Sequence, residues 1–203
     1  MLRRHIKARG ISDPRVLEAM AAVPREAFVE PGLTRRAYAD GPLPIGEGQT
    51  ISQPYVVAWM VEAAEVVVGN RVLEVGTGSG YSAAVLGRLA ETVYTVERRA
   101  VLAKAAAARL SELGCDNVSV RHGDGNEGWS EHAPYDAILV TAAGPGVPGA
   151  LREQLRTGGR LVMPIGGRWA TQRLVRERCG EAGQFTREEL GAVRFVPLVD
   201  EVC

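Results

Sequence analysis

The segment 71–81 constrains the fold of this chain more than any other. It begins with a short apolar run over 71–75, breaks into a glycine-rich turn, and continues with apolar residues at helical spacing over 83–89. Strand, turn and helix in this order open a βαβ unit, whose turn presents backbone N–H groups and the positive end of a helix to a ligand. The glycines of the turn are Gly76, Gly78 and Gly80.

Two carboxylates beside the turn narrow the class of ligand. Glu74 precedes the turn, where its charge would repel a pyrophosphate but suit a ligand with an ammonium and a sulfonium group. Glu97 ends the next expected strand, over 92–96, at the spacing where an acid accepts hydrogen bonds from ribose hydroxyls. The G-x-G-x-G spacing also differs from the G-x-G-x-x-G of dinucleotide sites, since Tyr81 takes the last position. These features favour S-adenosylmethionine over a nicotinamide cofactor, and a purely structural turn is the alternative.

The composition fits one domain with a full core. The chain has 203 residues, 46% of them apolar, and its 24 basic residues balance its 24 acidic ones. A net charge of zero argues against electrostatic capture of nucleic acid or of an anionic membrane. No apolar run approaches the roughly 20 residues of a membrane span, and no apolar segment follows the basic start at 1–9. We therefore expect a single domain over 1–203.

Cysteine and histidine usage argues against a disulfide framework and against a metal site. The cysteines are scattered without a C-x-x-C spacing, as in reduced cytosolic proteins, at Cys115, Cys179 and Cys203. The three histidines form no ligand cluster with them. We expect a cytoplasmic protein without a metal ion.

Strands and helices alternate along the rest of the chain, as in an α/β fold that binds ligands at the carboxyl ends of its strands. Before the glycine turn we expect a helix from Ser12-Asp13-Pro14 to Val23, short helical turns over 25–40, and a glycine- and proline-rich loop over 41–49. Beyond it we expect helices over 100–113 and 147–155, and strands over 117–121, 135–140, 160–163, 171–176 and 191–198. Trp59, Trp129 and Trp169 are expected to pack rather than to bind bases.

Ser52 lies where the loop meets an amphipathic helix, which makes it a candidate N-cap. A serine hydroxyl at a helix N-terminus is also well placed to hold a carboxylate, and the two roles are compatible. Asp124, in the Gly-Asp-Gly that ends the third strand, would face the ligand edge of the sheet or simply form a turn.

Several motifs resemble those of bacterial protein-L-isoaspartate O-methyltransferases, and the resemblance covers essentially the whole chain. Its most specific part is L-P-I-G at 43–46 followed by G-Q-T-I-S-Q-P-Y at 48–55, which general methyltransferases lack. Further matches are L-E-V-G-T-G-S-G-Y at 73–81, V-Y-T-V-E at 93–97, G-D-G at 123–125 and A-P-Y-D-A-I at 133–138.

The resemblance implies a Rossmann-like, seven-stranded, mainly parallel sheet flanked by helices, with a helical, substrate-side extension over 1–66 and the core over 67–203. It implies an enzyme that transfers the methyl group of S-adenosylmethionine to the free α-carboxylate of L-isoaspartyl residues in damaged proteins, which starts repair through a succinimide. Ser52 takes the position of the active-site serine. The positions implied to bind the cofactor, or its product S-adenosylhomocysteine, are Thr50, Ile51, Glu74, Gly76, Thr77, Gly78, Glu97, Asp124, Gly125 and Gln172.

The implied chemistry needs no general base and no metal. The carboxylate is already ionised, so the protein must only align it with the methyl carbon and exclude water. Ser52 would orient the carboxylate by a hydrogen bond rather than attack.

Other functions remain open. The nearest alternative is a methyltransferase of the same fold acting on another carboxylate, in a modified peptide. A base methyltransferase is disfavoured because T-A-A-G at 141–144 lacks the Asn/Asp-Pro-Pro-aromatic motif. A non-catalytic binding module would not need Ser52 in its Thr-Ile-Ser-Gln-Pro setting. The sequence suggests no nucleic acid, membrane or obligate protein partner.

Overall fold

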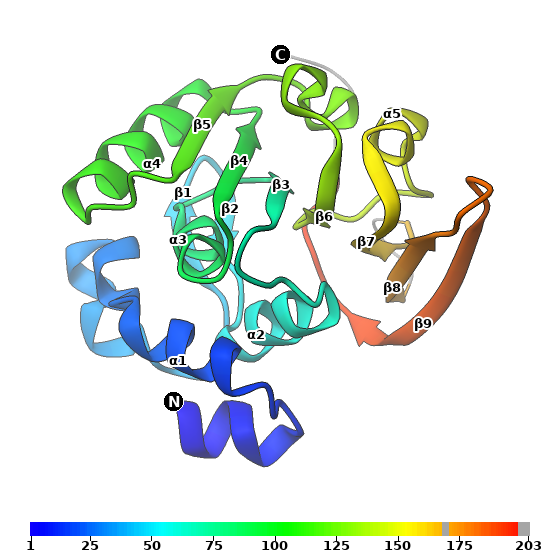
Figure 1. Cartoon of the computed structure of the whole chain (residues 1–203). Coiled ribbons are helices and arrows are strands. Elements are labelled where there is room, and N and C mark those ends of the chain that lie inside the picture. The colour runs from blue at the N-terminus through cyan, green and yellow to red at the C-terminus, as the bar shows by residue number, and fades with distance from the viewer. Residues whose placement is uncertain (168–170, 199–203) are drawn as a thin grey trace.

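The chain folds around a seven-stranded sheet, as the sequence predicts. The computed structural model describes residues 1–167 and 171–198. The strands stand in the order β5-β4-β3-β6-β7-β8-β9; the first five are parallel, and β8 and β9 are antiparallel to their neighbours (Figure 1). Their bounds are β3 Arg71–Val75, β4 Thr92–Glu97, β5 Val118–His122, β6 Tyr135–Val140, β7 Leu155–Ile165, β8 Gln172–Cys179 and β9 Phe185–Val193.

Two hydrophobic cores lie on the two faces of this sheet. In β3, Val72 belongs to the core under helices α1 to α4, whereas Leu73 and Val75 belong to the core on the other face, with Leu151 of α5. Strand β6 is buried along its whole length, as expected for a central parallel strand covered on both faces. The helices are α1 Pro14–Ala22, α2 Pro54–Ala63, α3 Tyr81–Gly87, α4 Ala100–Glu112 and α5 Gly149–Glu153 (Figure 1). Among the described residues, no helix is long and apolar enough to cross a bilayer.

Helix α1 begins where the capping chemistry predicts. The Asp13 carboxylate accepts a hydrogen bond from Arg15 N at 2.9 Å, and Pro14 occupies the first turn, where its missing N–H costs nothing. The following residues form two 3₁₀ turns, Arg25–Phe28 and Pro31–Arg36, as the short-helical prediction for 25–40 requires.

A β-hairpin replaces the loop expected over 41–49. Strand β1 (Leu43–Gly46) pairs antiparallel with β2 (Gln49–Ile51). Residues 46–48 all have positive φ, at 88°, 52° and 66°, and the two glycines among them let the chain reverse at little cost. Leu43 and Ile45 are buried while the residues between and after them are exposed, so β1 has the two-residue period of a strand.

The prediction that Ser52 caps the next helix is wrong. Helix α2 begins at Pro54, its N-cap is Gln53, and no side chain makes a capping hydrogen bond. The fixed φ of proline favours the first helical position, so the helix starts there and leaves Ser52 in the connection from β2.

The C-terminal part of the chain extends the sheet and then returns to its ligand edge. Strand β9 begins at Phe185, earlier than predicted, because the polar segment before 191 is the mostly exposed part of a strand that pairs with β8. Residues 195–198 then run beside the end of β6: Ala143 N donates to Val196 O at 2.8 Å, and Leu198 N donates to Ala143 O at 2.7 Å.

Some predictions lie outside the described residues. These are the packing role of Trp169 and the statements on 199–203, including Cys203. Trp59 and Trp129 are half-buried and pack against the two cores, as predicted.

Candidate active site

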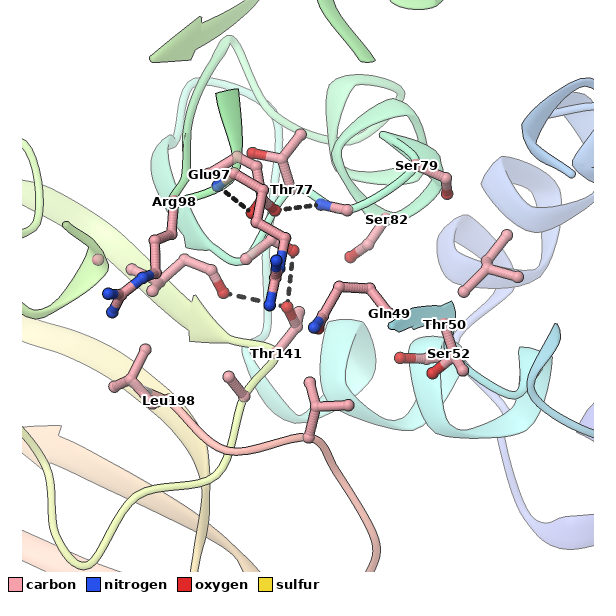
Figure 2. A pocket seen from close by; sticks show the side chains of 18 of the residues that line it. Gln49, Thr50, Ser52, Thr77, Ser79, Ser82, Glu97, Arg98, Thr141 and Leu198 are labelled. Carbon is pink, nitrogen blue, oxygen red and sulfur yellow. Dashed lines mark hydrogen bonds between the residues drawn. The ribbon is translucent and has the colours of Figure 1, made fainter. Parts of the chain in front are cut away.

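A cavity lies at the carboxyl ends of β3, β4 and β6, where this fold places its ligands. The volume inside it that no atom occupies, including the part open to solvent, is about 980 Å³. Figure 2 shows Gln49, Thr50 and Ser52 on one side of it and Glu97 and Arg98 on the other. The lining residues come from the hairpin and α2 (Gln49, Thr50, Ile51, Ser52, Val57, Met60), from β3 and the turn into α3 (Val75, Gly76, Thr77, Gly78, Ser79, Tyr81, Ser82), from the end of β4 (Val96, Glu97, Arg98, Arg99), and from Gly125, Thr141, Ala142, Val196, Pro197 and Leu198.

The glycine turn presents bare backbone to this cavity. Gly76, Gly78 and Gly80 have φ of 97°, 53° and 91°, a region that side chains disfavour. A Cβ on Gly76 would lie 2.3 Å from Thr141 Oγ1, so this position excludes a side chain by contact as well as by backbone conformation. Because Gly76, Thr77 and Gly78 all line the cavity, a ligand can approach their main chain closely.

Glu97 lies where the sequence predicts a ribose-binding acid. The residue is 7% exposed and lines the cavity. Its Oε2 accepts a hydrogen bond from Gly78 N at 2.8 Å, and its Oε1 accepts one from Arg99 N at 2.9 Å. A carboxylate has about four lone-pair sites, so Glu97 can hold the glycine turn and still accept hydroxyl donors from a ribose.

Glu74 lies beneath the turn, fully buried, and is not one of the lining residues. Its Oε2 accepts a hydrogen bond from the Thr95 hydroxyl at 2.7 Å, and that hydroxyl lies 2.6 Å from the hydroxyl of Thr77, which does line the cavity. Burial raises the pKa of Glu74 to about 7, although the Thr95 hydrogen bond opposes the rise. The structure therefore connects Glu74 to the cavity through neighbouring hydroxyls and not as a lining residue; the hydroxyl of Ser82, which lines the cavity, also favours the charged form of Glu74.

The end of β2 brings Thr50, Ile51 and Ser52 to the cavity wall, as predicted. Within residues 1–167 and 171–198, the Ser52 hydroxyl has no hydrogen-bond partner. Its carbonyl is held from behind, because Arg25 Nη2 donates to Ser52 O at 2.7 Å. The backbone of Ser52 is thus fixed while its hydroxyl can turn toward a ligand.

Asp124 and Gln172 support the wall without lining it. Asp124 Oδ1 accepts a hydrogen bond from Asn126 N at 2.9 Å and caps the 3₁₀ turn that places Gly125 in the wall. Gln172 is 3% exposed, its Oε1 accepts from Phe195 N at 2.6 Å, and its Nε2 donates to Phe195 O at 3.1 Å. Gln172 therefore fixes the segment whose next three residues line the cavity.

Several lining residues are missing from the predicted set. Ser79 and Ser82 flank the start of α3, and Arg98 and Arg99 follow β4; all four directly follow strand-end motifs that the sequence shows. The position of Thr141, directly after β6, carries the same signal, since ligands bind outside strand ends. Residues 196–198 fall in the strand expected over 191–198, but β9 ends at Val193, and these residues reach the cavity by pairing with the end of β6.

The fold and the cavity together define a class of protein. A doubly wound sheet, a bare glycine turn after β3 and a carboxylate at the end of β4 form the site of an S-adenosylmethionine-dependent methyltransferase. Comparison with known families makes this specific: the family model described as protein-L-isoaspartate(D-aspartate) O-methyltransferase matches residues 1–203. The chain belongs to this family.

Individual relatives agree with this assignment. The chain is 57% identical over 199 residues to protein-L-isoaspartate O-methyltransferase 2 of Pelobacter propionicus, covering 98% of this chain and 88% of the relative. It is 58% identical over 200 residues to the protein-L-isoaspartate O-methyltransferase of Rhodopseudomonas palustris, covering 98% and 91%.

Solved structures show the same fold. A protein-L-isoaspartate O-methyltransferase matches with a TM-score of 0.86 and 31% identity, over 97% of this chain and 64% of that one. A Plasmodium falciparum structure, described as a beta-aspartate methyltransferase in complex with S-adenosyl-L-homocysteine, matches with a TM-score of 0.82 and 27% identity, over 95% and 94%. The chain is an S-adenosylmethionine-dependent protein carboxyl O-methyltransferase, as the sequence predicts.

Proposed function

We propose that this enzyme methylates the free α-carboxylate of L-isoaspartyl residues in damaged proteins, and that Ser52 orients this carboxylate. The observation that carries the proposal is the Ser52 hydroxyl, which lies in the cavity wall without a hydrogen-bond partner in the described part of the chain. A hydroxyl donates readily to a carboxylate, and a charge-assisted bond of this kind is short and directional.

The opposite side of the cavity suits the adenosyl part of the cofactor. In this assignment Glu97 accepts hydrogen bonds from the ribose hydroxyls. The cofactor approaches the main chain of Gly76, Thr77 and Gly78 closely. Gly125 would contact the adenine end, with Asp124 fixing its turn. Thr50 and Ile51 would lie between cofactor and substrate.

In this assignment Gln172 and Glu74 do not contact the ligand but position residues that line the cavity. Gln172 holds Phe195 and, through it, the segment 196–198. Glu74 orients the hydroxyls of Thr95 and Thr77.

The chain's own groups have a limited task in the reaction. When bound, S-adenosylmethionine would supply a methyl group on its sulfonium, which would pass to a carboxylate oxygen as the S–C bond breaks and S-adenosylhomocysteine is released. Ser52 holds the carboxylate oxygen in line with that bond, and the segment 196–198 helps to exclude water. No proton needs to be removed, because the carboxylate is ionised at neutral pH.

We further propose that residues 1–66 form a substrate-side extension of the core over 67–203. The support is that Gln49, Thr50, Ile51 and Ser52 come from this part of the chain and line the cavity. A cytoplasmic location, and function without nucleic acid or an obligate protein partner, stay predictions from the sequence.

Methyl transfer from labelled S-adenosylmethionine to two matched peptides tests the function. The peptides differ only in whether one residue is L-isoaspartyl or L-aspartyl. We expect the isoaspartyl peptide to accept the label at least about a hundredfold faster, because a small misplacement of the reacting group costs about that factor. Equal rates for the two peptides would overturn the substrate assignment and leave the cofactor assignment intact.

A further inference from the structure

Arg25 is a fully buried arginine that lies directly behind the cavity wall. Its side chain is 0% exposed, at the start of the 3₁₀ turn Arg25–Phe28. Nη2 donates to the carbonyl of Ser52 at 2.7 Å, and Nε donates to the carbonyl of Ala37 at 2.8 Å. The guanidinium carbon lies 4.7 Å from the ring centroid of Tyr81, which lines the cavity. Arg25 thus contacts both Ser52 and the residue that ends the glycine turn.

The charge of Arg25 has no counter-charge within the described chain. Besides the two carbonyls, Arg25 interacts with the neutral Tyr81 side chain, which favours the charged form of the guanidinium. No Asp or Glu oxygen of residues 1–167 or 171–198 forms an ion pair with it, and Nη1 is buried without a hydrogen-bond partner. Its neighbour Glu26 is exposed and accepts a hydrogen bond from the Tyr38 hydroxyl instead. Burial lowers the pKa of the Arg25 guanidinium, although an arginine stays protonated at neutral pH. An unpaired buried charge is costly, so its presence here needs a reason.

A purely structural role explains only part of this arrangement. Holding two carbonyls requires hydrogen-bond donors, which a neutral side chain could supply without the cost of burying a charge. The missing carboxylate is explained if the anion that balances Arg25 arrives with the substrate and is held in the cavity, on the other side of Ser52; Nη1 itself stays buried and does not contact it.

We propose that Arg25 is a positioning residue that attracts the substrate carboxylate to Ser52 by its uncompensated charge and aligns Ser52 through the carbonyl it holds. This inference rests on the proposed function. The Ser52 hydroxyl lies within about 7 Å of Nη2, since both are tied to one residue by standard bond lengths. At that separation inside a protein, the positive charge of Arg25 attracts a carboxylate bound at Ser52 by a Coulomb energy that bulk water would largely screen.

The two parts of this role affect different kinetic constants. The carboxylate carries its full charge when it binds and loses it as the ester forms, so attraction by Arg25 mainly lowers KM. The hydrogen bond from Arg25 to the Ser52 carbonyl fixes the backbone of Ser52, so its loss should mainly lower kcat.

Two substitutions at Arg25 separate these effects. Arg25→Lys keeps the charge but loses the paired donors, whereas Arg25→Met keeps the apolar stem and loses both. We expect kcat to fall in both variants, KM for the isoaspartyl peptide to rise about tenfold to a hundredfold in Arg25→Met, and KM in Arg25→Lys to stay within about threefold of wild type. Cofactor affinity, measured by calorimetry, should stay near the wild-type value in both.

A matched control and a folding check accompany these variants. Arg36→Met removes an exposed arginine from the neighbouring 3₁₀ turn Pro31–Arg36, and should leave KM unchanged. If Arg25→Met does not fold, the KM of Arg25→Lys decides: a tenfold rise there contradicts the charge role, and a near-wild-type value supports it. An unchanged KM in a folded Arg25→Met protein overturns the proposal. Wild-type turnover of the isoaspartyl peptide tests the proposed function separately, because the variants are judged only relative to wild type.

Discussion

At the scale of single residues, Ser52 carries the substrate side of the site. Because Gln53 and not Ser52 is the N-cap of α2, removing the hydroxyl should not weaken that helix. We expect Ser52→Ala to lower kcat about tenfold to a hundredfold, the equivalent of one hydrogen bond to a charged group, while Tm and cofactor affinity stay near wild type. Steady-state rates beside thermal unfolding check this. Full activity in the variant would remove Ser52 from the mechanism without affecting the assignment of the family.

Glu74 makes the stability of the protein depend on pH. Its pKa is about 7 in the folded protein and 4.5 as an unperturbed group, so between these values the folded state binds more protons than the unfolded state. The free energy of unfolding should therefore fall as pH rises from about 4.5 to 7, by up to about 3 kcal/mol from this group at 1.36 kcal/mol per pKa unit.

Glu74→Gln isolates this effect, because it removes the titrating group and keeps the side-chain length. Denaturant unfolding at pH 5 and pH 8 should show the variant gaining stability relative to wild type as pH rises. A difference between variant and wild type that does not change with pH would show that Glu74 titrates normally.

At the scale of elements, the turn between β3 and α3 fixes the cofactor side. A Cβ on Gly76 meets Thr141 Oγ1, which itself donates to Gly76 O at 2.7 Å and to Val75 O at 3.0 Å. Gly76→Ala should therefore lower Tm and weaken cofactor binding, through backbone strain of about 1–2 kcal/mol and through displacement of Thr141.

Gly10→Ala provides the matched control for the turn. Gly10 has a φ of 101°, close to the 97° of Gly76, but a Cβ there would meet nothing within 4 Å. The control should lose stability by strain alone and bind the cofactor normally. Equal losses of cofactor affinity in the two variants would show that the contact with Thr141 does not matter.

The C-terminal segment depends on one buried amide. Gln172→Ala removes both hydrogen bonds to Phe195, so the segment 196–198 should lose its fixed position. We expect a loss of about 1–3 kcal/mol in unfolding free energy and a rise in the KM of both substrates, measured beside Gln184→Ala, whose side chain lies on an exposed turn. A normal KM for both substrates in Gln172→Ala would mean that the segment is held by its pairing with Ala143 alone.

At the scale of the whole molecule, the sequence predicts the centre of the sheet well because β3 and β6 are short apolar runs, each followed by a turn. Strand β7 begins at Leu155, earlier than the predicted 160–163, because residues 156–159 are polar or glycine. Strand β6 matches the predicted 135–140, and the glycine turn and Glu97 lie where expected. These features are local: one apolar run, one turn, one acid at a strand end.

The sequence predicts less where the structure depends on distant contacts. The sequence does not predict the hairpin β1–β2, because its glycines and prolines indicate a loop. Only the burial of Leu43 and Ile45 in the structure shows that β1 is a strand. The place of Glu74 beneath the turn, and of Gln172 behind the C-terminal segment, follows from packing between elements far apart in the chain. The local sequence does not predict the burial of Arg25, since an arginine after a proline is usually a surface residue.

The central claim is that the methyl group goes to the α-carboxylate of an isoaspartyl residue. The most direct measurement compares two isoaspartyl peptides of one sequence, one with the free α-carboxylate and one with an α-carboxamide in its place, each incubated with the enzyme and labelled S-adenosylmethionine. Mass spectrometry should find one methyl group on the carboxylate peptide, at that carboxyl, and none on the carboxamide peptide. Equal labelling of the carboxamide peptide would place the methyl group elsewhere and contradict the account.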